Sequence, residues 1–306
     1  MYKKSLLPTI VLFLVTACSA RVPAPPGSGP VLLASATFLA DIAQNVAGDR
    51  TTVESLLPAG TDPHSYQPVP ADAVKIQAST VLIINGIEYE HFIASLLENV
   101  EGERLVITAS DGLEPRHMHE EHASETEAEH AAGDPHMWLD PHLVITYVEN
   151  IRAGLTQTDP AGTEIYRANA DAYIAQLKDL DSWIVEQVAQ IPANRRLLVT
   201  NHEALGYFGD RYGFQIVGTV LRSVSSEASV SAQELSAVIE EINAAGAPAI
   251  FLDEVENENL AQQIAEETGV IVVADLHLES LTEGEPAGTY IDMMRHNVTR
   301  IVESLK

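Results

Sequence analysis

Residues 160–190 read PAGTEIYRANADAYIAQLKDLDSWIVEQVAQ, and the organisation of the whole chain can be inferred outward from them. The segment contains neither glycine nor proline after Gly162. Its apolar residues recur at spacings of seven, four and three, at Tyr166, Tyr173, Leu177, Leu180, Ile184 and Val188. This period predicts one amphipathic helix with Pro160 in its first turn. Because such a helix would be roughly 45 Å long, more than one domain needs, we predict a rigid connector between two lobes.

Short apolar runs alternate with helical patterns on both sides of this connector. The expected strands are 31–36, 51–57, 81–85 and 105–108 before it, and 196–200, 215–220, 249–253 and 270–274 after it. The expected helices are near 38–47, 70–78, 91–99, 141–156, 204–212, 231–244, 257–267 and 288–305. This alternation predicts an α/β fold in which two similar lobes with mostly parallel sheets are joined by one long rigid helix. Clefts between lobes are preferred ligand sites.

Residues 1–30 have the pattern of a targeting segment followed by a tether. Lys3 and Lys4 precede a short apolar run, and Val15-Thr16-Ala17-Cys18 is typical of a bacterial lipobox. The run is too short to span a bilayer, which needs about 20 residues. Cys18 is the only cysteine, so no internal disulfide can form, and we expect this residue to carry a lipid. The alternative is an ordinary secretory signal with an incidental cysteine.

The predicted domains follow from these boundaries. Residues 1–17 are expected to be a lipoprotein signal peptide, and 18–30 a flexible lipid-anchored tether. An N-terminal lobe then covers 31–157 and includes a His/Glu-rich loop at 114–134. The linking helix covers 158–192, and the C-terminal lobe covers 193–306. The mature protein would be extracytoplasmic and anchored to a bacterial membrane.

The chain is strongly acidic and gathers its histidines in one region. Its formal net charge is −27, which repels nucleic acid and attracts cations, although solubility alone would also account for it. Residues 114–142 hold six of the eleven histidines. Imidazole and carboxylate groups in one tract suit divalent transition metals. The candidate accessory metal ligands in the loop are His117, His119, His122 and His130. The loop is interpreted as a weak metal collector, a metal sensor or a solvated segment without function.

Four residues outside the low-complexity part of this loop lie at expected strand ends, and they are the candidate metal ligands His64, His136, His202 and Asp275. Open α/β sheets bind ligands beyond the carboxyl ends of their strands. Two of the four residues belong to each lobe, so one ion could be held across the cleft. Three imidazoles and one carboxylate complete a tetrahedral zinc shell.

Two motifs that are typical of metal-dependent hydrolases are weaker evidence for function than the four strand-end residues. Residues 117–122, HMHEEH, nearly match the HxHxDH motif of metallo-β-lactamase-like enzymes, but they lie in a low-complexity segment. His202-Glu203 begins like the zincin motif HExxH, but Gly206 stands where the second histidine is required. A catalytic zinc also keeps an open coordination position. We therefore expect no enzymatic activity and no catalytic or cofactor-binding residues.

Four motifs resemble those of the metal-binding lipoproteins of bacterial ABC importers for zinc and manganese, particularly the zinc branch. They are GTDPHSYQP at 60–68, HMWLDP at 136–141, TNHEALGYF at 200–208 and AEETG at 265–269. The resemblance implies that His64, His136 and His202 bind the metal. Asp275 falls where the family places its carboxylate, with His277 or water as alternatives. It further implies delivery of Zn²⁺ to an ABC permease and its ATPase by a protein that we expect to be monomeric.

The identity of the metal is also inferred from the resemblance. Similar manganese carriers typically have a glutamate at the position of His202, and they usually lack a histidine-rich loop. Imidazole suits zinc, whereas oxygen-rich shells suit manganese. We therefore expect zinc. The alternatives are manganese or iron in the same importer class, and, from another class, a metal-dependent surface adhesin.

Overall fold

The computed structural model describes residues 29–306 apart from 99, 118–132, 222–225, 227–229 and 257. The expected lipidation site, Cys18, and the loop histidines His119, His122 and His130 lie outside the described residues. Among the described residues, no helix is both long enough and apolar enough to cross a membrane.

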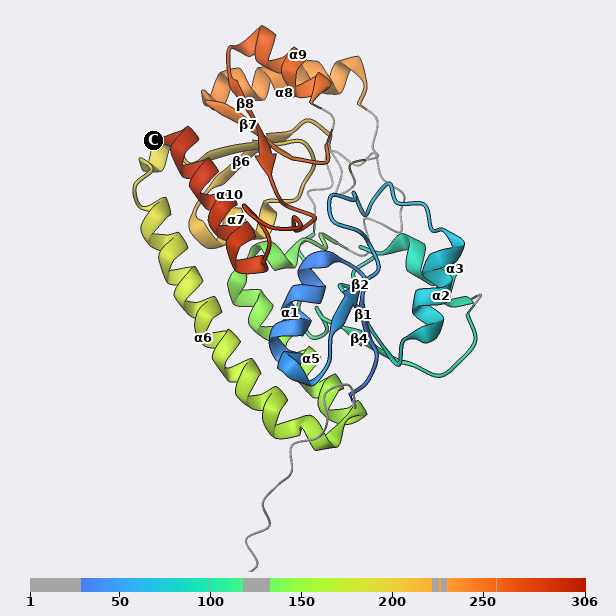
Figure 1. Ribbon diagram of the computed structural model, residues 1–306. Helices are drawn as coiled ribbons and strands as arrows, with labels where there is room; N and C mark the ends of the chain where they lie inside the picture. Colours follow the sequence, from blue (N-terminus) through green and yellow to red (C-terminus); the bar gives the residue numbers. More distant parts are fainter. Residues whose placement is uncertain (1–28, 99, 118–132, 222–225, 227–229, 257) are drawn as a thin grey trace, which may run out of the picture.

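Two four-stranded parallel sheets form the framework, one in each lobe (Figure 1). The first has the order β2-β1-β3-β4 and comprises β1 (Leu32–Ala34), β2 (Val53–Ser55), β3 (Val81–Ile84) and β4 (Leu105–Thr108). The second has the order β6-β5-β7-β8 and comprises β5 (Leu197–Thr200), β6 (Gln215–Thr219), β7 (Ala249–Asp253) and β8 (Ile271–Leu276). The second sheet therefore repeats the strand order of the first, which confirms the predicted α/β class.

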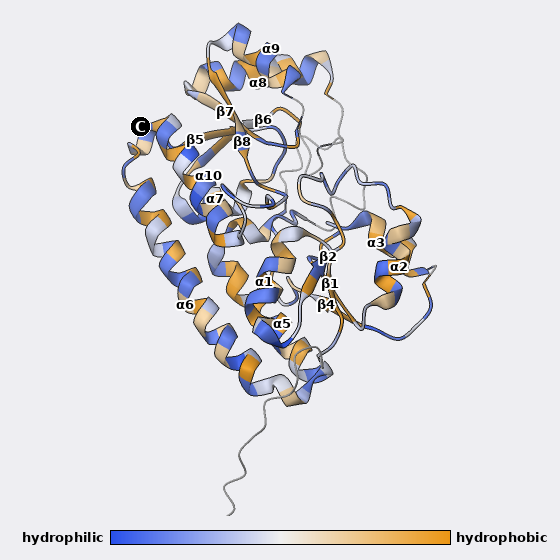
Figure 2. Cartoon of the chain, viewed as in Figure 1, coloured by the Kyte–Doolittle hydropathy of each residue, from blue (hydrophilic) through white to orange (hydrophobic). Residues whose placement is uncertain are grey.

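Helices cover both faces of each sheet, as all-parallel sheets require. In the first lobe they are α1 (Thr37–Ala47), α2 (Pro70–Ala78), α3 (His91–Glu98) and α5 (Pro141–Thr158). In the second lobe they are α7 (Gly206–Tyr212), α8 (Ala232–Ala245), α9 (Asn259–Thr268) and α10 (Tyr290–Leu305). The central strands β1, β3 and β7 are consequently mostly apolar, whereas the helices alternate polar and apolar residues (Figure 2).

The inner faces of the two sheets share one hydrophobic core. Alternate strand residues divide between the faces: in β7, Phe251 joins the shared core, whereas Ile250 and Leu252 join a separate core against α8 and α9. The shared core includes Leu32 from the first lobe and Leu305 from the last helix. Apolar packing is therefore continuous between the lobes, which limits large relative movements.

The long helix α6 (Thr163–Val188) runs beside both lobes (Figure 1). Its buried residues are the periodic positions found in the sequence, together with Ala170. The predicted start at Pro160 was three residues early, because Pro160–Gly162 forms a separate 3-10 turn. A Cβ at position 162 would lie 2.6 Å from Nε of Arg50. Glycine therefore leaves room here for the Arg50–Asp159 ion pair.

The topology brings the loops that follow the strands to one cleft. In both sheets the strand order reverses beside the first strand of the lobe, between β1 and β3 and between β5 and β7. Ligands of open α/β sheets bind outside the carboxyl ends of strands at such reversals. One of these loops ends at Asp140, which caps α5 by accepting a hydrogen bond from His142 N. The short loops after β2, β5 and β8 supply the other side chains of the cleft.

Candidate metal centre

Four ligand-type side chains meet between the lobes: His64, His136, His202 and Glu279. Their ligand atoms all lie within 4.8 Å of one another. His64 follows β2 and His136 precedes α5 in the first lobe, whereas His202 follows β5 and Glu279 follows β8 in the second. Each lobe thus contributes two of the four groups.

The distances within the cluster match a small coordination shell. Oε1 of Glu279 lies 3.0 Å from Nε2 of His136, 3.3 Å from Nε2 of His202 and 3.8 Å from Nε2 of His64. The two Nε2 atoms of His136 and His202 are 3.4 Å apart. A tetrahedral zinc ion with bonds of about 2.0–2.1 Å would separate its ligands by roughly 3.3–3.4 Å. The separation between His202 and Glu279 and that between His136 and His202 match this spacing, whereas His136 stands closer to Glu279 and His64 stands farther from it.

The cluster is buried, and part of its hydrogen-bonding capacity is unused. The side chains of His64, His136 and Glu279 are at most 2% exposed. Nε2 of His64 and Oε2 of Glu279 have no hydrogen-bond partner. A buried polar atom without a partner costs about 1–3 kcal/mol, so such atoms require an explanation. A cation at the centre would satisfy Nε2 of His64, and it would also satisfy Oε2 of Glu279 if the carboxylate bound through both oxygens.

Carboxylates behind two of the histidines fix the orientation of their rings. Oδ1 of Asp134 lies 2.8 Å from Nδ1 of His136 and accepts a hydrogen bond from its backbone N at 2.9 Å. Oε1 of Glu256 lies 2.6 Å from Nδ1 of His202. Each carboxylate engages Nδ1 and so directs Nε2 to the centre, an arrangement typical of metal-binding histidines.

The loop that carries Glu279 is held by a buried carboxylate at the end of β7. Oδ2 of Asp253 accepts hydrogen bonds from the backbone N atoms of Leu278 and Glu279. Burial, followed by the charge of Glu279, raises the pKa of Asp253 to about 7. Backbone N of Asp253 donates to Oε2 of Glu256 at 2.8 Å, so the group that orients His202 and the group that holds Glu279 are themselves connected.

The charges within the cluster shift its ionisation in opposite directions. Burial lowers the pKa of His136, but Glu279 and Asp134 raise it more, to about 8. His202 likewise has a pKa well above its usual value, because Glu256 and Glu279 outweigh burial. Burial raises the pKa of Glu279, but the adjacent histidines bring it well below the usual range. In the metal-free protein, the raised pKa values of His136 and His202 therefore favour a proton on these imidazoles beside the carboxylate.

The structure does not bring Asp275 into the cluster, which corrects the predicted fourth ligand. Strand β8 continues to Leu276, so Asp275 lies within the strand and not at its end. Its side chain is 52% exposed and pairs with Nε of Arg300 at 2.8 Å. The alternative ligand His277 is also outside the cluster, and its Nδ1 lies 2.9 Å from Oε1 of Glu254. The carboxylate in the cluster is Glu279, in the loop that follows.

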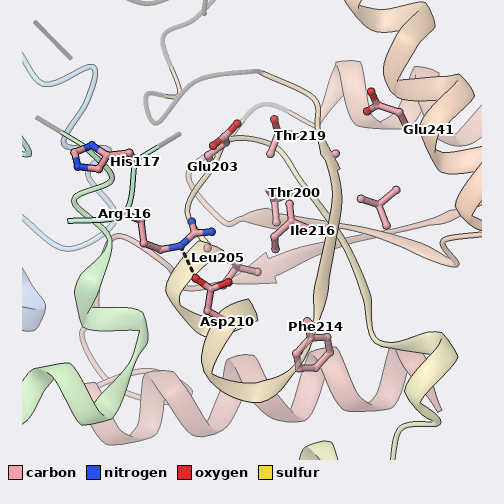
Figure 3. A pocket seen from close by; sticks show the side chains of 13 residues that line it. Arg116, His117, Thr200, Glu203, Leu205, Asp210, Phe214, Ile216, Thr219 and Glu241 are labelled. Atoms are coloured by element: carbon pink, nitrogen blue, oxygen red, sulfur yellow. Dashed lines mark hydrogen bonds and ion pairs between the residues drawn. The ribbon is translucent and has the colours of Figure 1, made fainter. Parts of the chain in front are cut away.

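Three acids that lie close in sequence to the histidines, Asp62, Asp140 and Glu203, do not orient the histidine rings through the contacts described above. Asp62 accepts a hydrogen bond from His64 N at 2.9 Å, and Asp140 caps α5. Glu203 lines a neighbouring hollow of about 310 Å³ together with His117, the one accessory histidine among the described residues (Figure 3). The orienting residues Asp134 and Glu256 were missed; only the position of Asp134, two residues before His136, offered a signal in the sequence.

The chain matches the family described as "Zinc-uptake complex component A periplasmic" over residues 32–304. The manganese-binding lipoprotein MntA of Halalkalibacterium halodurans is 33% identical, over 91% of this chain and 89% of its own length. The iron-binding protein YfeA of Yersinia pestis is 34% identical, over 87% of this chain and 83% of its own. Among solved structures, the periplasmic zinc binding protein TroA from Treponema pallidum has a TM-score of 0.80 at 28% identity, covering 90% of this chain and 99% of that one.

These relatives are named for manganese, iron and zinc, so they support a divalent metal without selecting one. The matched family is described as an uptake component, which confirms the prediction that this chain is not an enzyme. The fold, the cluster between the lobes and the match over nearly the whole chain lead to one assignment. This chain belongs to the family of zinc-uptake complex component A periplasmic proteins, the metal-binding solute-binding proteins of ABC importers.

Proposed function

We propose that this protein captures Zn²⁺ outside the cytoplasm and delivers it to an ABC permease for high-affinity uptake. The observation that carries the proposal is the buried convergence of three imidazoles and one carboxylate within 4.8 Å. A transported ion needs a site that holds it and then opens. Because each lobe supplies two of the four ligands, a small displacement of the lobes would divide the shell and free the ion.

The chemistry of the donor set favours zinc. Imidazole nitrogen is a good ligand for zinc, whereas manganese prefers oxygen-rich shells of higher coordination number. The ligand separations of 3.3 and 3.4 Å also suit the short bonds of a tetrahedral zinc ion, and those of 3.0 and 3.8 Å lie on either side of this spacing. Manganese is the second candidate. Oε2 of Glu279 has no hydrogen-bond partner, and binding through both carboxylate oxygens would supply a fifth donor.

Calorimetric titration of the metal-free protein tests this choice. We expect one tight site for zinc and binding of manganese at least about 100-fold weaker, because three of the four ligands are imidazoles. A protein with the reverse preference would be a manganese carrier of the same class. Absence of tight binding by zinc, manganese and ferrous iron alike would contradict a role as a metal carrier.

We also propose that the protein is attached to the membrane and that its partners are an ABC permease and its ATPase. A lipid on Cys18 would hold the protein at the membrane, close to the permease and its ATPase. The name of the relative MntA, a lipoprotein, supports this anchor. Mass spectrometry of the membrane-extracted protein should find Cys18 at the N-terminus with attached acyl chains. An unmodified Cys18, or an N-terminus elsewhere, would contradict it.

We further propose that the His/Glu-rich loop binds extra zinc weakly and is separate from the tight site. Replacing residues 118–132 by a two-residue Asn-Gly link should keep the fold, because Arg116 and Asp134 already pair as an antiparallel bridge. We expect the shortened protein to keep one tight zinc site. It should lose the weaker zinc binding that we expect of the full-length protein when zinc is in excess. Loss of the tight site would show that the loop belongs to it.

A further inference from the structure

A network of polar contacts joins the two lobes beside the cluster. Two residues near the ends of the His/Glu-rich loop, Arg116 and Asp134, form an antiparallel bridge in which Asp134 N donates to Arg116 O at 2.9 Å. Helix α7 of the second lobe faces this bridge. The hydroxyl of Tyr207 accepts a hydrogen bond from Arg116 N at 2.8 Å and donates one to Asp134 O at 2.7 Å. The guanidinium of Arg116 also donates to Asp210 of α7 at 2.7 Å (Figure 3).

The same guanidinium is connected to one of the proposed metal ligands. Nη1 of Arg116 lies 3.4 Å from Oδ2 of Asp134, whose other oxygen binds the ring and the backbone of His136. The side chain of Asp134 is 2% exposed and that of Asp210 is 68% exposed. Arg116 therefore bridges a buried carboxylate of the first lobe and a surface carboxylate of the second.

Gly206 provides the space that the guanidinium occupies. A Cβ at this position would lie 1.9 Å from Nη1 of Arg116 and 2.9 Å from Oδ2 of Asp134. The backbone at Gly206 does not have a positive φ, so the turn itself does not require glycine. Any larger residue would displace Arg116 from its place between the carboxylates.

We propose that Arg116, Asp134, Tyr207 and Asp210 form an interlobe latch that positions His136 and slows release of the bound metal. The proposal rests on the proposed function, since it concerns the same cluster. Release requires the lobes to part, and parting must break the contacts of Arg116 and Asp134 with α7. Contacts that exist only in the closed protein act chiefly on the dissociation rate.

The latch could act through its geometry or through the electrostatic effect of its charges on a cation. Variants that retain the charge of Arg116 distinguish these two effects. Arg116→Lys retains the positive charge but cannot bridge two carboxylates as the guanidinium fork does. Gly206→Ala leaves Arg116 in the chain and expels its guanidinium, which can move because its side chain is 34% exposed. In stopped-flow transfer of zinc to excess chelator, we expect each variant to release zinc roughly three- to tenfold faster than wild type.

Two matched controls should release zinc at the wild-type rate. Arg152→Lys alters an arginine that is 33% exposed and that pairs, among the described residues, with Glu149 of its own helix. Gly209→Ala adds a methyl group to α7 next to Asp210 in the sequence, but this methyl group meets Ile216 at 3.2 Å and none of the latch side chains. Wild-type rates in Arg116→Lys and Gly206→Ala would overturn the latch, as would equal acceleration in the controls. A wild-type protein without a tight zinc site would instead overturn the proposed function, so the two failures are distinguishable.

Discussion

Replacing Glu279 by glutamine is expected to weaken zinc binding by at least about 100-fold. Loss of a group that merely orients a metal ligand costs about 10- to 100-fold in affinity, and Glu279 would be a ligand itself. Glutamine keeps the volume of the side chain and the backbone contacts of Asp253 with residue 279. It removes the only carboxylate of the four-residue cluster. Calorimetry or competition with a chelator of known affinity measures the loss.

Asp275→Asn is the matched control for this substitution. Asp275 lies four residues earlier, is about half exposed and pairs with Arg300 at the surface. Exposed pairs of this kind contribute about 0–1 kcal/mol to stability, and Asp275 does not contact the cluster. We expect its variant to bind zinc within about twofold of wild type. Full affinity in Glu279→Gln together with a loss in Asp275→Asn would restore the assignment made from the sequence.

The error over Asp275 shows what strand periodicity can and cannot predict. The apolar run ends at Ala274, so the sequence suggested a strand end there. Pairing with β7 extends β8 to Leu276, opposite Asp253. An outward-facing charged residue is compatible with a strand, because alternate side chains lie on opposite faces. Strand existence was therefore predictable, whereas the last strand residue, which decides which acid enters the cleft, depended on tertiary pairing.

The meeting of the three histidines at one place between the lobes was predictable, because each follows a strand or stands at the ordered end of a loop. Glu256, which orients His202, was not predictable, since the two residues are 54 positions apart and meet through the parallel pairing of β5 with β7. Glu203, the nearest acid in the sequence, faces a different hollow. Proximity along the chain predicts contacts between side chains within one turn. It does not predict contacts between distant loops that meet at the edge of a sheet.

Zinc affinity is expected to fall steeply on acidification. Zinc binds only the unprotonated imidazole, so a proton on His136 must leave before the ion enters. With the pKa of His136 at about 8, proton competition at this residue alone should weaken binding by about tenfold per pH unit below 8, or about 1000-fold at pH 5. His202, whose pKa is also raised, adds to the loss. Competition titrations between pH 5 and 9 measure the slope.

The stability of the metal-free protein should change in the opposite direction. Because the folded pKa of His136 exceeds that of an unfolded histidine, its contribution is fully present below about 6.5 and is lost as pH rises through about 8. Asp253 and Glu90, whose pKa values burial raises to about 7, add the same sign. The melting temperature without metal should therefore fall from pH 6 to pH 8.5, while the increase produced by a fixed zinc concentration grows. A zinc-induced increase that is independent of pH would contradict a shell built on three imidazoles, because zinc must displace protons from them in this range.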